Sequence, residues 1–95
     1  KNEKAFANLT SMKNAFYGCY ALNIVPSFAN STKLTDISYA FMKCYLLDVP
    51  PSFFGCHAIT TTDYAFAHCY SLPDKADIPM ETDTTYLECT NIYLE

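Results

Sequence analysis

The chain has 95 residues, of which 51% are hydrophobic, 16% aromatic and 17% charged. This length suits one small domain, and the composition is too apolar for a chain that stays disordered. Six lysines, no arginine and ten acidic residues give a net charge of −4, the opposite of what a nucleic-acid-binding protein needs. Because no run of about 18 apolar residues occurs, we expect neither membrane insertion nor a signal peptide within these residues.

A period of 25 residues runs through most of the chain. Residues 9–33 align with residues 34–58 without a gap and share ten identities in 25 positions. The period is marked by a phenylalanine, a cysteine three residues later and a leucine three residues after that. These positions are Phe16, Phe41 and Phe66; Cys19, Cys44 and Cys69; and Leu22, Leu47 and Leu72. Since one coil of this length cannot bury its own apolar face, we predict that these nine residues form a core between stacked coils.

Each period contains two related halves. The same spacing returns in weaker form at Phe28 and Phe53, so the chain is expected to turn twice per period. A phenylalanine and a cysteine three residues apart share one face of a helical or 3₁₀ turn, which predicts short helices at residues 38–43 and 63–68. Each of these segments begins with a residue type that is favoured as an N-cap.

Four short segments have the composition of strands. Residues 22–25 and 47–49 alternate in polarity and end at prolines, whereas residues 34–37 and 59–62 are rich in β-branched side chains. Stacked coils would pair like strands in parallel, about 4.8 Å apart. The predicted fold is therefore an α/β repeat, a solenoid of short parallel strands joined by short helical turns.

The expected domain organisation is a single repeat solenoid over residues 1–95. Its coils are predicted at about residues 9–33, 34–58 and 59–72, followed by an irregular acidic cap at residues 73–95. The charge changes at this boundary, from +1 before residue 73 to −5 after it, and Cys89 follows Cys69 by 20 residues rather than 25. With only about three coils, the chain is expected to be a fragment of a longer protein.

The segments 15–19, 27–44 and 63–69 resemble the BspA-like leucine-rich repeats of surface proteins, and related repeats in bacterial lipoproteins. The resemblance covers residues 9–72 and depends on the aromatic, cysteine and leucine positions. It implies a right-handed leucine-rich-repeat solenoid on cell-surface or secreted proteins of bacteria and some protists, used in adhesion and in binding host or matrix proteins. It implies no catalytic residue and no fixed ligand.

Five cysteines in 95 residues first suggest disulfide bonds. All five, however, follow an aromatic residue by three positions, where a repeat needs a small buried side chain, and free cysteine is often buried. We predict reduced, inaccessible thiols, with Cys89 in the irregular last module as the first to react. Two disulfides in a crosslinked secreted scaffold are the alternative.

The pairs Cys56-His57 and His68-Cys69 are the candidates for a metal site or a Cys-His nucleophile. Neither has the spacing of a zinc motif, and a residue next to an inward cysteine should point outward. No pair of carboxylates lies together in the repeat. We therefore expect no enzymatic activity, no metal and no cofactor.

Tyr20, Tyr45 and Tyr70 are the candidate binding residues, because each follows an inward cysteine and should stand on the surface, stacked about 5 Å apart. This row either binds sugars or a partner protein, or merely stabilises the stack. Asn8 and Asn30 lie in N-glycosylation motifs, which matter only in a eukaryotic secretory pathway.

The function expected from these features is non-enzymatic protein or glycan binding by an adhesion module of an extracellular or cell-surface protein. Its ligand would lie on a host or matrix molecule, and its signal or membrane anchor would lie outside this chain. The alternative is a structural spacer or a self-assembling filament or virion element, because exposed edges at an uncapped end favour end-to-end association.

Overall fold

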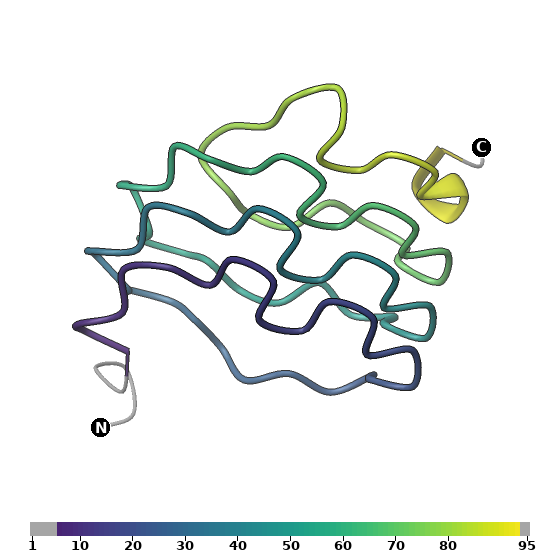
Figure 1. Ribbon diagram of the computed structural model, residues 1–95, viewed down its shortest axis with the longest axis horizontal. Helices are drawn as coiled ribbons and strands as arrows, with labels where there is room; N and C mark the ends of the chain where they lie inside the picture. Colours follow the sequence, from purple (N-terminus) through teal and green to yellow (C-terminus); the bar gives the residue numbers. More distant parts are fainter. Residues whose placement is uncertain (1–5, 94–95) are drawn as a thin grey trace.

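The chain winds in successive coils that lie one above another (Figure 1). The structure is a computed structural model that describes residues 6–93. We name residues 9–33 coil 1, residues 34–58 coil 2, residues 59–72 coil 3 and residues 73–93 the C-terminal segment. Within the described residues the only regular element is η2, a 3₁₀ helix at Thr90–Tyr93 near the end of the chain.

The predicted α/β leucine-rich-repeat solenoid is wrong. The described residues contain no sheet, and their parallel pairing is limited to two isolated bridges, from Ser11 to Asp36 and from Asp36 to Thr61. None of the four predicted strands forms, and turns replace the helices predicted at residues 38–43 and 63–68. The 25-residue period is therefore built from turns rather than from strands and helices.

Left-handed backbone conformations explain why no helix forms at these positions. Tyr39 and Lys43 have φ values of 60° and 66°, which a right-handed helix does not allow. The same conformation recurs 25 residues later, at Tyr64 and His68. The N–H group of Cys44 closes a single turn on the carbonyl of Phe41 at 3.1 Å, and the left-handed residues on both sides prevent that turn from extending.

Proline and exposure explain why the segments at residues 22–25 and 47–49 are not strands. Ile24, expected to point inward, is 83% exposed, and Val49 is 61% exposed. Pro26 and the pair at residues 50–51 have no N–H group to donate to a neighbouring strand. Within the described chain, no backbone hydrogen bond joins residues 23–27 to residues 48–51. These segments are extended but unpaired.

Backbone hydrogen bonds between coils hold the stack together. The N–H groups of Asn14, Phe16 and Gly18 donate to carbonyls of coil 2 at 3.1, 2.7 and 2.8 Å. The equivalent N–H groups of coil 2, at Tyr39, Phe41 and Lys43, donate to coil 3 at 3.0, 2.7 and 2.8 Å. The N–H groups between them close turns within their own coil, so the backbone is satisfied without a sheet.

Two columns of stacked aromatic rings form the core. In the first column, the ring centroids of Phe16 and Phe41 are 5.1 Å apart, and those of Phe41 and Phe66 are 5.3 Å apart. In the second column, Phe28 stacks on Phe53 at 5.5 Å. These distances equal the spacing of the coils, so each coil contributes one ring to each column.

The structure divides the nine predicted core residues by coil. The six in coils 2 and 3 are fully buried: Phe41, Phe66, Cys44, Cys69, Leu47 and Leu72. In coil 1, by contrast, Phe16 and Leu22 are only half-buried and Cys19 is exposed. The prediction of a buried Cys19 is therefore wrong, because no described residue covers the outer side of coil 1 at this position.

The turn at Gly55 should be more sensitive to substitution than the turn at Gly18. Both glycines are left-handed, with φ values of 80° and 74°, so Ala at either position should cost about 1–2 kcal/mol of stability. A Cβ atom at Gly55 would lie 2.3 Å from Oδ1 of Asn30, whereas one at Gly18 would meet nothing closer than 4.0 Å. Gly55→Ala should therefore unfold at a lower temperature than Gly18→Ala, measured by circular dichroism. Equal midpoints would contradict the contact with Asn30.

Candidate functional site

A row of three stacked tyrosines runs across the coils. The centroids of Tyr20 and Tyr45 are 5.0 Å apart and those of Tyr45 and Tyr70 are 5.2 Å apart, with interplanar angles of 17° and 10°. Tyr20 and Tyr70 are 55% and 45% exposed, and Tyr45 is half-buried between them. We call these three residues the tyrosine stripe. The structure thus places all three predicted binding residues side by side on the surface.

The stacking decides which parts of the stripe can meet a ligand. Both ring faces of Tyr45 are covered by its neighbours, so its edge and hydroxyl group remain available. His68 packs edge-on against Tyr70 at 5.8 Å, and its Nδ1 atom lies 3.0 Å from the Tyr70 hydroxyl. The stripe therefore offers a row of ring edges and hydroxyl groups rather than a set of open ring faces.

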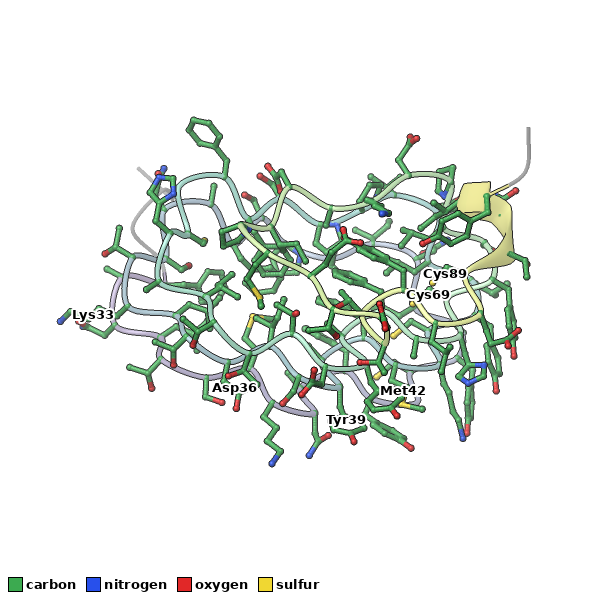
Figure 2. The ribbon with its side chains drawn as sticks, turned by 90° about the horizontal axis from the view of Figure 1, so that it is seen from above. Lys33, Asp36, Tyr39, Met42, Cys69 and Cys89 are labelled. Carbon is green, nitrogen blue, oxygen red and sulfur yellow. The ribbon has the colours of Figure 1, made fainter. Side chains whose placement is uncertain are left out.

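A second row of tyrosines was not found from the sequence. Tyr39 stacks on Tyr64 at 5.1 Å, and Tyr17 stacks on Tyr39 at 6.3 Å. Tyr39 lies along one edge of the molecule with Asp36 and Met42 (Figure 2). The pair Tyr39 and Tyr64 follows the 25-residue period and was detectable, but Tyr17 does not, because Asn14 occupies the equivalent position in coil 1.

The buried cysteines are hydrogen-bond donors between coils. Their thiols donate to backbone carbonyls of aromatic residues in the preceding coil. These bonds join Cys44 to Phe16 at 3.2 Å, Cys56 to Phe28 at 3.0 Å, Cys69 to Phe41 at 3.1 Å and Cys89 to Phe66 at 2.8 Å. Each thiol thus adds one link across an interface between coils.

All five cysteines are free thiols, and their environments differ. Burial raises the pKa of Cys44 to about 11, and it also raises the pKa of Cys56. The neighbouring thiol of Cys89, together with burial, raises the pKa of Cys69. Cys69 and Cys89 both lie inside the molecule (Figure 2). The expectation that Cys89 reacts first is therefore wrong, because Cys89 is fully buried and Cys19 is the exposed thiol.

The two Cys-His pairs do not form a site in this structure. His57 is exposed beside the buried Cys56, and His68 contacts Tyr70 rather than a thiol. Within residues 6–93, no group of three or more histidine, cysteine or acidic side chains is arranged to hold a metal ion. The adjacent residues of each pair point to opposite sides of the chain, as expected for neighbours in an extended or turn segment.

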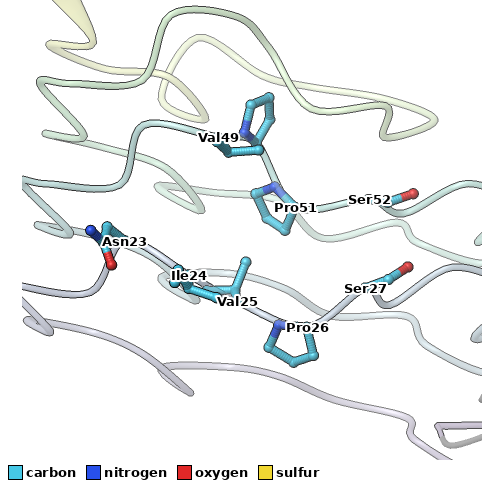
Figure 3. Close-up of a pocket in the computed structure, with 9 residues that line it drawn as sticks. Asn23, Ile24, Val25, Pro26, Ser27, Val49, Pro51 and Ser52 are labelled. Carbon is cyan, nitrogen blue, oxygen red and sulfur yellow. The ribbon is translucent and has the colours of Figure 1, made fainter.

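A shallow groove lies between the unpaired segments of coils 1 and 2 (Figure 3). Its volume is about 250 Å³, and it is lined by residues 23–27 and 49–52. Ile24, Val49 and the prolines Pro26 and Pro51 provide most of its apolar surface. The lining holds no charged side chain, so the groove offers neither a general acid nor a general base.

Neither relatives nor membrane-spanning elements identify the site. Comparisons with known protein families, with curated proteins and with solved structures find no match. In the part of the chain that the structure describes, no helix has the length and apolarity needed to cross a bilayer. The candidate site is therefore argued from the geometry of the tyrosine stripe.

Proposed function

We propose that the chain is a non-enzymatic protein-binding module that uses the tyrosine stripe as its contact surface. The observation that carries this proposal is the regular row of three exposed rings, 5.0 and 5.2 Å apart. Tyrosine is enriched at protein interfaces because its ring contributes apolar area and its hydroxyl group contributes hydrogen bonds. A row held by stacking is also pre-organised, so little side-chain freedom is lost on binding.

A protein partner is favoured over a glycan by the arrangement of the rings. Sugars stack on open aromatic faces, but the faces of Tyr45 are occupied by its neighbours in the stripe. Leu46, next to Tyr45, is 55% exposed and enlarges the apolar area around the stripe. Edges, hydroxyl groups and an aliphatic side chain together suit the mixed chemistry of a protein surface.

The resemblance of residues 9–72 to BspA-like surface repeats supports an extracellular or cell-surface setting for this module. On that basis, the proposed partner is a host or matrix protein, and the module serves adhesion. Fold-level analogy alone does not identify the ligand, so the proposal rests on the stripe. A structural spacer remains the competing function, in which the stripe would only stabilise the stack.

The experiment compares two single variants of exposed tyrosines in coil 1. Tyr20 ends the stripe and is 55% exposed, whereas Tyr17 belongs to the second row and is 45% exposed. Each stacks on a single tyrosine of coil 2, so the two Ala variants should lose similar stability. Wild type and both variants are passed over immobilised matrix proteins and over a glycan array.

We expect wild type to bind at least one immobilised matrix protein, and Tyr20→Ala to bind it at least about tenfold more weakly, as for an interface aromatic. Tyr17→Ala should bind like wild type. Equal binding by Tyr20→Ala and wild type, or binding to the glycans alone, would contradict the proposal. Circular dichroism of each variant confirms that the comparison concerns folded protein.

A further inference from the structure

The outer side of coil 1 exposes a surface that is buried everywhere else in the repeat. Ala15 is exposed, whereas the equivalent Ala40 and Ala65 are fully buried. Phe16 is likewise half-buried and Cys19 exposed, although their equivalents in coils 2 and 3 have no exposed surface. We call the outer side of coil 1, formed by Ala15, Phe16, Cys19 and Leu22, the end face.

The end face also carries unused hydrogen-bond acceptors. At the interface between coils 1 and 2, the carbonyls of coil 2 that accept from coil 1 belong to Ser38, Ala40 and Met42. The equivalent carbonyls of coil 1 belong to Lys13, Ala15 and Tyr17, and none of the described residues donates to them. A chain that covers the end face must therefore present N–H groups from alternate residues.

The thiol of Cys19 completes this pattern. Cys44, Cys69 and Cys89 each donate to the carbonyl of an aromatic residue in the preceding coil. Cys19 has no such acceptor among the described residues. A covering segment with an aromatic residue beneath Phe16 would supply this acceptor and would continue the ring column at the 5.1 Å spacing seen between Phe16 and Phe41.

The opposite end of the stack is closed. The ring of Tyr86 stacks on Phe66 at 5.3 Å and is only 3% exposed. The hydroxyl group of Tyr86 accepts a hydrogen bond from the N–H group of Ala76 at 3.0 Å, and the ammonium group of Lys75 lies 5.4 Å from the ring centroid. The C-terminal segment therefore covers the last ring, and only the end face is left open in the described structure.

We propose that the end face binds a segment of its own repeat type supplied by another polypeptide. Such a segment carries an aromatic residue, a cysteine or small residue three positions later and an aliphatic residue six positions later. The interfaces between coils 1, 2 and 3 define this chemistry, since the same face is covered in that way at each. A second copy of this chain fits less well: its far end is closed, and two end faces brought together would oppose their carbonyl rows.

The test uses a labelled peptide with the sequence of residues 34–58 and measures its binding to the full chain by fluorescence anisotropy. The protein variants are Phe16→Asp, which places a charge on the end face, and Tyr20→Ala, which alters the tyrosine stripe. A second peptide carries an N-methyl group at the residue equivalent to Phe41, which removes the central N–H donor and keeps every side chain. Circular dichroism verifies that both variants are folded.

Saturable binding is expected for the unmodified peptide with wild type and with Tyr20→Ala. Binding should be at least about tenfold weaker with Phe16→Asp or with the N-methylated peptide, because each change removes a central contact. Undetectable binding at up to about 1 mM peptide, the weak end of specific affinities, would overturn the proposal. Equal binding by Phe16→Asp, or self-association of wild type through the end face in sedimentation, would also overturn it. The response of Tyr20→Ala keeps this outcome separate from that of the tyrosine stripe.

Discussion

Phe41→Ala should lower the free energy of unfolding by about 3–5 kcal/mol, as for other large cavities in a core. Phe41 is fully buried at the centre of the first ring column. It stacks on Phe16 and Phe66 and meets the edge of Phe28 at 6.3 Å, so its removal leaves three rings with a missing neighbour. A chain of this size has only about 5–15 kcal/mol of total stability, so the loss should be visible as a large drop in the unfolding midpoint.

Thermal and urea unfolding of the variant, followed by circular dichroism, measure this loss. Phe54→Ala is the matched control, because Phe54 is in the same coil but is 69% exposed. The control should change stability by no more than about 0.5 kcal/mol, as for surface substitutions generally. Equal midpoints for the two variants would show that the ring column does not hold the coils together.

Alkylation of the native protein should modify Cys19 alone. Cys19 is exposed, whereas the other four thiols are buried, and Cys44, Cys56, Cys69 and Cys89 donate hydrogen bonds to carbonyls. Only the thiolate reacts, and burial raises the pKa of Cys44 to about 11 from 9.0. At pH 8 the thiolate fraction of Cys44 should therefore be roughly a hundredfold below that of an ordinary thiol, in addition to its steric protection.

Intact-mass measurement counts the modified thiols before and after unfolding in denaturant without reductant. One modification is expected in the native protein and five after unfolding, while Cys19→Ser should react at none in the native state. Four thiols missing after unfolding would show two disulfides. Early modification of Cys89 would show that the C-terminal segment opens before the rest of the stack.

The tyrosine stripe illustrates how far sequence reasoning reaches for the candidate site. The period placed Tyr20, Tyr45 and Tyr70 at equivalent positions, and the preceding cysteines assigned them to the surface. The period contains no information about ring orientation, because orientation is set by contacts between coils. Only the structure shows that the rings stack face to face, which leaves edges and hydroxyl groups for a partner.

The turns were missed although part of their signal was present. Asn14, Gly18 and Asn30 occupy left-handed positions in coil 1, and asparagine and glycine are the residue types that adopt this conformation most readily. Tyr39 and Lys43 occupy the same positions in coil 2 and hide that signal, because neither residue type favours a positive φ. Spacing alone then suggested a helix.

The sequence by itself determined the 25-residue period and the assignment of Phe41, Cys44 and Leu47 to the inside, since both follow from where apolar residues recur. The tertiary structure alone decided that the coils are joined by alternate N–H groups between turns, without strands or helices. It also decided that Cys19 is exposed while Cys44 is buried. Equivalent residues differ in this way because burial depends on which coil lies on the other side, and that neighbour is a property of the folded stack.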